Sequence, residues 1–192
     1  MNKVETSIPG VFIIEPVVYF DKRGWFMESY NQIEFSENGL HVVFIQDNHS
    51  LTMKSGCIRG IHYQARPYWQ TKLVRCINGR VLDIIVDLRI DSPTYLSHVK
   101  IEISSKNKKQ VYIPKGCGHA FISLEDDSEV EYKVDIPYRK EFDRAIRFDD
   151  PNISIDWPTE NAQLSEKDLD APYISEIDKS EFTSYENDGE IL

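Results

Sequence analysis

The chain has 192 residues, of which 41% are hydrophobic and 28% charged, and its formal net charge at pH 7 is −10. A chain of this size can bury one sizeable core, so we expect a single domain over residues 1–175. The negative charge disfavours binding to nucleic acid or to an anionic membrane. Because no run of about 18 apolar residues exists and the N-terminus is too polar for a signal peptide, we expect a soluble, cytoplasmic protein.

The cysteines indicate the redox environment of the protein, and the C-terminal residues indicate where the domain ends. Cys57, Cys76 and Cys117 are odd in number and lack CxxC spacing, so neither a disulfide framework nor a zinc site is expected. From Glu176 to Glu190, six acidic residues accompany one lysine, a composition typical of a solvated segment. We therefore expect residues 176–192 to form an acidic C-terminal tail.

Short segments rich in Val, Ile, Phe and Tyr, without sustained helical periodicity, make the strand the dominant predicted element. In chain order, strands are expected at 11–14, 25–30, 42–48, 58–63, 72–77, 80–87, 98–103, 110–113, 119–123, 130–134 and 144–148. Asn78-Gly79 is the strongest hairpin signal. Short helices are expected within 31–39 and after Ser165, the predicted N-cap. This pattern predicts an all-β jelly-roll barrel with short peripheral helices.

Two histidines lie in segments that resemble the cupin motifs. His62 follows Gly56 by six residues within a predicted strand, as in the first motif. The metal-binding form of that motif needs a second histidine two residues later, where this chain has Gln64, and a carboxylate soon after, whereas residues 65–78 contain no acid. One histidine does not supply the three ligands of a catalytic metal. His119, which a Pro-Gly turn leads into its strand, resembles the second motif; alone, either histidine could be structural.

A lysine is predicted to face the core. Lys72 alternates with Val74 and Cys76, and a buried lysine must be paired or functional. Asp83, on the partner strand of the predicted hairpin, is a candidate for an ion pair with it. The alternative is a cation placed to stabilise an oxyanion in a pocket.

Together these segments resemble the dTDP-4-dehydrorhamnose 3,5-epimerase family from about residue 14 to residue 172. The matching blocks are DKRGWFMES, FIQDNHS, RGIHYQ, KLVRCINGRVLDIIVDLR, SPTY, IPKGCGHAF, YK, IDWP and LSEKD. Many blocks in collinear order are a far stronger signal than any single motif. The resemblance implies a cupin-type jelly roll, a homodimer whose N-terminal strands complete the partner's sheet and site, and no metal or other cofactor.

The resemblance also implies roles for individual residues. His62 would be the general base, oriented by Asp168. Lys72 would hold the charge on the ketone oxygen, and Tyr132 would donate a proton on the opposite face. Arg59 would contact the diphosphate, and Arg23 would do so across the dimer. The full set of implied substrate-binding residues is Arg23, Glu28, Gln46, Asn48, Arg59, His119, Tyr138, Asp143 and Lys167.

These residue types suit proton transfer next to a ketone. A proton on carbon 3 or 5 of a 4-keto sugar is acidic only because the enolate spreads charge onto the ketone oxygen, so catalysis needs a base near neutral pKa and a cation. We expect inversion of both carbons of a dTDP-4-keto-6-deoxyhexose, giving dTDP-4-dehydro-L-rhamnose for deoxysugar and polysaccharide biosynthesis. The alternatives are a 3- or 5-only epimerase acting on a related nucleotide-linked 4-keto sugar, a sugar-binding module without activity, and a metal-dependent cupin enzyme.

Some details depart from the family pattern. Strict alternation would place Arg59 and His62 on opposite faces, so both can serve one site only if the strand is bulged near Gly60. Asp143 stands where the family commonly has a glutamate. The family usually has phenylalanine and alanine before the second histidine and glycine after it, where this chain has Cys117, Gly118 and Ala120. These differences leave the sugar and nucleotide preference open.

Overall fold

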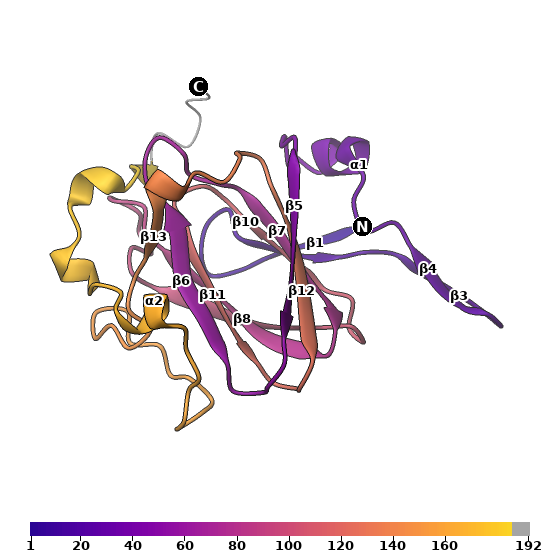
Figure 1. Ribbon diagram of the computed structural model, residues 1–192. Coiled ribbons are helices and arrows are strands. Elements are labelled where there is room, and N and C mark those ends of the chain that lie inside the picture. Colours follow the sequence, from indigo (N-terminus) through magenta and orange to yellow (C-terminus); the bar gives the residue numbers. More distant parts are fainter. Residues whose placement is uncertain (186–192) are drawn as a thin grey trace.

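The computed structural model describes residues 1–185, which form mainly β-strands with a few short helices (Figure 1). The strands are β1 (Asn2–Glu5), β2 (Phe12–Glu15), β3 (Val18–Asp21), β4 (Gly24–Met27), β5 (Gln46–Thr52), β6 (Ile58–Gln64), β7 (Lys72–Asn78), β8 (Arg80–Asp87), β9 (His98–Ser104), β10 (Gln110–Ile113), β11 (Cys117–Ser123), β12 (Ser128–Val134) and β13 (Asp143–Ala145). The helices are α1 (Gln32–Glu37), α2 (Glu166–Leu169) and the 3₁₀ turns η1 (Lys140–Phe142), η2 (Ile174–Glu176) and η3 (Lys179–Glu181).

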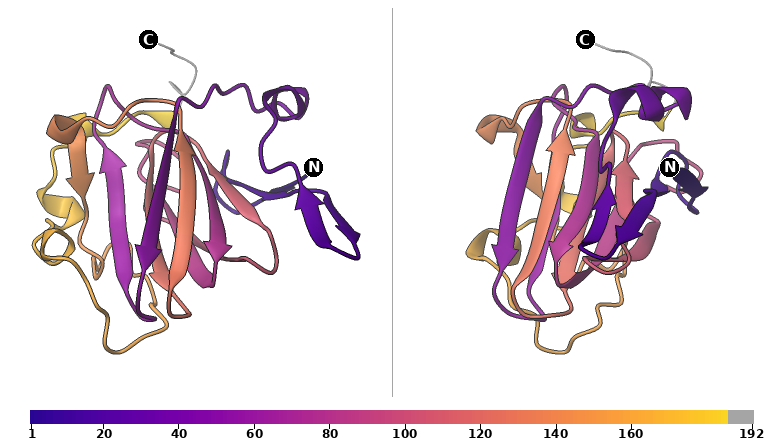
Figure 2. Two further views of the ribbon diagram at one scale, coloured as in Figure 1. Left: turned by 45° about the vertical axis from the view of Figure 1, so that its right-hand side comes forward. Right: turned by 90° about the vertical axis from the view of Figure 1, so that its right-hand side faces the viewer.

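Two antiparallel sheets face each other as the walls of a barrel. One has the strand order β1-β2-β10-β7-β12-β5 and the other β13-β6-β11-β8-β9. The hairpin β3-β4 belongs to neither sheet and extends away from the barrel (Figure 1, Figure 2). This architecture confirms the predicted all-β jelly-roll class.

The five-stranded sheet is buried on both faces, as β8 shows. Val81 and Ile85 belong to the apolar cluster between the two sheets, whereas Ile84 and Val86 belong to a second cluster on the other face. The two sets alternate along the strand because successive side chains point to opposite faces. Since β8 is apolar on both faces, the two carboxylates that it buries, those of Asp83 and Asp87, each need a specific partner.

Predicted and observed elements agree best where the apolar pattern is clear. β8 and β10 have the predicted bounds, and Asn31 and Ser165 cap α1 and α2 through their side-chain oxygens. The predicted strand at 42–48 is shifted, because the regular strand begins at Gln46. β1 and β3 were not predicted, since each is a four-residue strand in which three of the four side chains are exposed.

The predicted bulge in β6 is present. In the pairing with β11, His119 lies opposite His62 and Phe121 lies opposite Arg59, so three residue steps on β6 match two on β11. Gly60 has a φ of +118°, and a Cβ at this position would lie 2.6 Å from the carbonyl oxygen of His119. Glycine therefore permits the bulge, which lets Arg59 and His62 serve the same cavity.

The expectation of a solvated tail from residue 176 is wrong for residues 176–185. Phe182 is 3% exposed and its ring lies against Tyr63 and Trp69. Ile90 and Thr183 are joined by a backbone hydrogen bond of 2.8 Å. The segment is held because its apolar residues complete the second cluster, which its acidic composition conceals. The rest of the expected tail, 186–192, lies outside the described residues.

Within residues 1–185, none of the helices has the length and apolar character needed to cross a membrane.

Candidate active site

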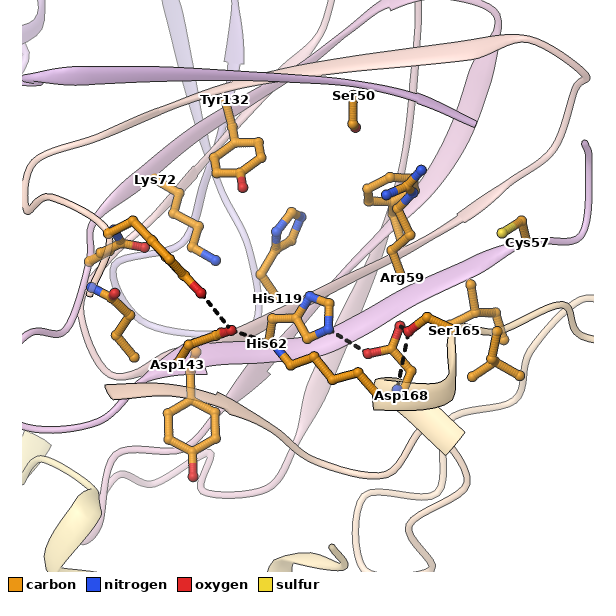
Figure 3. A pocket seen from close by; sticks show the side chains of 18 of the residues that line it. Ser50, Cys57, Arg59, His62, Lys72, His119, Tyr132, Asp143, Ser165 and Asp168 are labelled. Atoms are coloured by element: carbon orange, nitrogen blue, oxygen red, sulfur yellow. Dashed lines mark hydrogen bonds and ion pairs between the residues drawn. The ribbon is translucent and has the colours of Figure 1, made fainter. Parts of the chain in front are cut away.

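A cavity of about 550 Å³ opens between the two sheets. Its lining comes from β5, β6, β7, β11, β12 and β13, from the loop that carries Tyr138 and from the segment that contains α2. It brings together nine of the predicted site residues, which are Arg59, His62, Lys72, His119, Tyr132, Tyr138, Asp143, Lys167 and Asp168. Figure 3 shows most of these side chains pointing into one space.

His62 and Asp168 form a histidine–carboxylate pair between β6 and α2. The distance from His62 Nε2 to Asp168 Oδ1 is 2.5 Å, and Asp168 is 2% exposed (Figure 3). Ser165 donates from its Oγ to the other carboxylate oxygen at 2.9 Å. Burial alone would raise the pKa of Asp168, but hydrogen bonds from His62 and Ser165 hold it below its ordinary value. The carboxylate therefore stays ionised and orients the imidazole.

A second histidine–carboxylate pair lies deeper in the barrel. His119 Nε2 is 2.7 Å from Asp83 Oδ1, and Asp83 is fully buried. The other oxygen, Asp83 Oδ2, is buried without a hydrogen-bond partner among the described residues. The candidate ion pair between Lys72 and Asp83 is therefore not what the structure shows, because the carboxylate bonds to His119. The predicted hairpin at Asn78-Gly79 is also wrong as a pairing, because β7 and β8 lie in different sheets.

Lys72 is the buried cation of the site. It is 7% exposed and makes no ion pair within residues 1–185, and its Nζ lies 5.7 Å from the centroid of the Tyr132 ring. Burial lowers the pKa of the Lys72 ammonium to about 8, against the charges of Asp83 and Asp143, which raise it. Lys72 is therefore mostly protonated at pH 7 and free to interact with a bound anion.

Tyr132 faces His62 from the opposite sheet. In Figure 3 its ring enters the cavity from β12, near Lys72 and His119, whereas His62 enters from β6. Burial, and then the charge of Asp143, raises the pKa of the Tyr132 phenol. The hydroxyl thus keeps its proton near neutral pH and can donate it to a basic centre.

Polar groups mark the two ends of the cavity. At one end, Arg59 donates from Nε to Thr52 Oγ1 at 3.1 Å and from Nη2 to the carbonyl of Leu51 at 2.9 Å. At the other, Asp143 Oδ2 accepts from Lys167 Nζ at 2.6 Å and from the Tyr138 hydroxyl at 3.1 Å. The cavity thus offers cationic groups on both sides of its catalytic centre.

Four predicted residues do not line this cavity. Gln46 and Asn48 lie on the same face of β5 as Ser50, which does line it, and Gln46 donates to Asn48 at 2.8 Å. Arg23 lies at the tip of the β3-β4 hairpin with an 84% exposed side chain, paired with Asp21 at 2.6 Å. Glu28 accepts from Asn31 at 3.0 Å. In a single protomer the hairpin that carries Arg23 points away from the barrel (Figure 2).

Sequence reasoning did not place several cavity residues in the site. Ser165 was predicted only as a helix cap, and Gln64 only as the residue in a metal-ligand position. Cys57, Gln70 and Gln163 lie at strand ends or in loops, where no periodic pattern indicates direction. No group of three or more His, Cys, Asp or Glu side chains arranged to hold a metal ion occurs in the part of the chain that the structure describes.

Comparison with known proteins places this site in a family. The model of a family described as dTDP-4-dehydrorhamnose 3,5-epimerase matches residues 5–176. The dTDP-4-dehydrorhamnose 3,5-epimerase of Shigella flexneri is 46% identical over 179 residues, which is 93% of this chain and 98% of that protein.

Solved structures agree with this match. The dTDP-6-deoxy-D-glucose-3,5-epimerase of Legionella pneumophila, solved with dTDP-4-keto-L-rhamnose, has a TM-score of 0.92 and 40% identity, covering 96% of this chain and 98% of that one. ChmJ, a 3'-monoepimerase of Streptomyces bikiniensis solved with dTDP-quinovose, has a TM-score of 0.86 and 30% identity, covering 95% and 93%. These findings confirm the resemblance and the cupin-type fold that it implied. The chain belongs to the dTDP-4-dehydrorhamnose 3,5-epimerase family.

Proposed function

We propose that this protein is an enzyme that inverts carbons 3 and 5 of a dTDP-4-keto-6-deoxyhexose, giving dTDP-4-dehydro-L-rhamnose. One observation supports this most strongly. His62 on one sheet, paired with Asp168 of α2, and the Tyr132 phenol on the opposite sheet face the same cavity, beside a buried lysine that makes no ion pair within residues 1–185. A base and an acid on opposite sides of a sugar are what inversion requires.

The reaction proceeds through an enolate. His62 takes the proton from the carbon next to the ketone, and the electron pair of the broken C–H bond moves onto the ketone oxygen. Lys72 stabilises the resulting negative charge. Tyr132 then gives its proton to the same carbon from the opposite face, the carbonyl re-forms, and the tyrosinate and His62 exchange protons with solvent before the next carbon reacts. All steps are proton transfers, so the reaction needs no redox cofactor.

The diphosphate and nucleotide are bound by residues around the catalytic centre. Arg59 can hold phosphate oxygens bidentately, and Lys167 supplies a second cation. Tyr138 lines the cavity, Gln46 and Asn48 lie on the same face of β5 as the lining residue Ser50, and all three would contact the nucleotide sugar. Asp143 and His119 complete the set, the first through its bonds to Lys167 and Tyr138.

A homodimer is part of the proposal. The hairpin β3-β4 exposes Phe20 and Phe26 by 76% and 70%, and Trp25 by 51%. Monomers rarely leave such aromatic groups in water, so we infer that a second copy of the chain covers them. Arg23 and Glu28 would then reach the partner's cavity from this hairpin. We also place the reaction in the cytoplasm, a location supported by three free cysteines, Cys57, Cys76 and Cys117.

A 3- or 5-only epimerase is the second candidate. It is favoured by the similarity to ChmJ, described as a 3'-monoepimerase, and by the departures at Cys117, Gly118, Ala120 and Asp143. One base and one donor can serve a single carbon or both, depending on whether the ring turns over between steps.

Proton NMR in deuterium oxide tests the proposal. The purified protein is incubated with dTDP-4-keto-6-deoxyglucose, and the signals at carbons 3 and 5 are followed separately. Loss of both signals is the expected result, and loss of one would identify a single-site epimerase. If neither proton exchanges while dTDP binds to the folded protein, the substrate is a different nucleotide sugar or the protein is not catalytic.

A further inference from the structure

We propose that Gln64 is a positioning residue that acts through Tyr138, by holding the loop that carries this tyrosine at the rim of the cavity. The inference rests on the proposed role of the cavity as the nucleotide-sugar site. Gln64 lies on β6 two residues after His62, is 3% exposed and lines the cavity.

The side-chain amide of Gln64 forms hydrogen bonds to the loop through both its oxygen and its nitrogen. Its Oε1 accepts from the backbone N–H of Arg139 at 2.6 Å, and its Nε2 donates to the carbonyl of Pro137 at 3.3 Å. The same Nε2 donates to the carbonyl of Tyr68 at 2.8 Å. Because Pro137 and Arg139 flank Tyr138, one side chain holds the backbone on both sides of the tyrosine, as a neighbouring strand would.

Two other glutamines hold the same loop. Gln46 accepts from the N–H of Tyr138 at 3.2 Å, and Gln70 donates to the carbonyl of Ile136 at 2.7 Å. In an extended chain, successive N–H groups point to opposite edges, so Gln46 and Gln64 hold opposite edges at Tyr138. The loop has little regular structure of its own. The glutamine side chains therefore supply the hydrogen bonds to its backbone that neighbouring strands supply in a sheet.

The tyrosine side chain is fixed from the same place. Tyr138 is 53% exposed, and its hydroxyl donates to Asp143, which lies directly opposite Gln64 in the register of β13 and β6. A half-exposed ring on an untethered loop would have to be ordered each time a ligand binds, which weakens binding. The bonds of Gln64 remove that cost before the ligand arrives. The position that holds a ligand in the metal-binding cupin motif serves here to position a binding loop.

Gln64→Met is the decisive variant, since methionine keeps the length of the side chain and removes both polar ends. We expect it to raise the Kd for dTDP, measured by calorimetry, and the KM for the nucleotide sugar by about two- to tenfold. The rate of deuterium incorporation at saturating substrate should stay within about twofold, because only binding is affected. A fall in that rate with unchanged affinity would overturn the proposal.

A double-mutant cycle tests whether Gln64 acts through Tyr138. In a Tyr138→Ala background, Gln64→Met should have no further effect on the Kd for dTDP, because the ring that it positions is gone. An equal loss of affinity in both backgrounds would mean that Gln64 does not act through Tyr138.

Amide hydrogen exchange tests the tether without any ligand. The Arg139 amide should exchange faster in Gln64→Met than in the wild type. An unchanged exchange rate would contradict the inference, and this result does not depend on which substrate the protein binds. If the wild-type protein does not bind dTDP, the proposed function is contradicted. The exchange rate of the Arg139 amide would still show whether Gln64 holds the loop.

A matched control is Asn107→Leu, which removes a side-chain amide in the turn after β9 that bonds to the backbone of β9 at Glu102 and Ser104, away from the cavity. It should leave the Kd for dTDP and the Arg139 exchange rate unchanged. If Gln64→Met does not fold, Gln64→Leu gives the same comparison, since it also removes both the acceptor for Arg139 and the donor to Pro137 and Tyr68.

Discussion

Lys72 illustrates how a single residue can favour turnover at the expense of stability. We predict that Lys72→Met lowers turnover by about 10² or more, because it removes a preorganised charge at the enolate oxygen. The same change should raise the free energy of unfolding by about 1–3 kcal/mol, since an ammonium that burial disfavours is replaced by an apolar chain. Deuterium incorporation and urea unfolding measure the two effects. A variant that loses stability would show that the ammonium has a partner in the folded protein.

The pH dependence of the wild type provides a check on Lys72. Burial sets the pKa of Lys72 at about 8, so turnover that needs the ammonium should fall as the pH rises through this value. The folded pKa lies below the ordinary lysine pKa of about 10.4, so the unfolded chain binds more protons between these values and this group makes the protein more stable as the pH rises there. The residual activity of Lys72→Met should lack the alkaline fall.

Tyr132→Phe separates the two halves of an inversion. Without the phenol, His62 can still remove the proton and solvent-derived deuterium can return from the same side. We therefore expect exchange at carbons 3 and 5 to persist, while the inverted product falls by about 10² or more, since a positioned acid typically contributes this much. Product analysis by proton NMR distinguishes the outcomes. Inverted product at the wild-type rate would rule out Tyr132 as the donor.

For individual residues, the sequence predicted which side chains point into the barrel better than it predicted which side chains form hydrogen bonds with each other. The alternation along β7 and β8 correctly placed Lys72 and Asp83 on faces directed inward. It could not show that Asp83 bonds to His119, because that choice depends on the spacing of three strands and not on the pattern of any one. The pair of His62 and Asp168 was implied by family resemblance, since the two residues lie 106 positions apart.

Gly60 is the residue on which the shape of β6 depends. We predict that Gly60→Ala destabilises the protein by about 1–3 kcal/mol or more, because a residue at φ +118° is strained and its Cβ would meet His119 and Ala120. Thermal or urea unfolding measures this. Gly39→Ala is the matched control, with φ +79° and only the end of the Lys3 side chain nearby, so it carries backbone strain with little contact. Equal losses in both variants would mean that contacts at Gly60 contribute nothing.

Elements were predictable where burial gave them a pattern. β8 has the expected bounds because its residues are apolar on both faces. β5 begins later than expected and is an edge strand, which among the described strands pairs only with β12. β1 could not be predicted, because its residues become a strand through pairing with β2, not through a preference of their own.

The C-terminal segment joins the fold of the whole molecule. Phe182 is 3% exposed and lies against the rings of Tyr63 and Trp69 on the outer face of the five-stranded sheet. We predict that Phe182→Ala lowers the free energy of unfolding by about 3–5 kcal/mol, as removal of a buried aromatic ring usually does. Urea unfolding measures it, and a loss below about 0.5 kcal/mol, typical of a surface position, would contradict the packing.

A mixed-dimer experiment tests whether sites are shared between protomers. His62→Asn and Arg23→Ala proteins, each nearly inactive, are unfolded together and refolded in equal amounts. If Arg23 serves the partner's cavity, each mixed dimer contains one intact site, and about a quarter of wild-type activity should return because half of the dimers are mixed. If Arg23 serves its own cavity, or the protein is a monomer, no activity returns.

For the molecule as a whole, the fold class was predictable from composition and strand pattern, whereas the point at which the packed chain ends was not. The acidic residues after 176 indicated a solvated tail, yet the chain is packed to Tyr185, because one phenylalanine and a few backbone bonds outweigh the surrounding charge. The amino-acid composition of a segment averages over its residues and therefore does not reveal a single buried side chain such as that of Phe182. The single domain expected over 1–175 stays a prediction.

The unusual acidity of Lys72 makes the cavity chemically addressable. Burial lowers the pKa of the Lys72 ammonium to about 8, so above neutral pH a larger fraction of Lys72 than of ordinary surface lysines is the neutral amine, which is the nucleophilic form. A small activated ester that fits the cavity should therefore acylate Lys72, with release of its leaving group, ahead of the exposed lysines. The same group that stabilises the enolate offers a point of attachment for covalent inhibitors and for probes that report whether the cavity is filled.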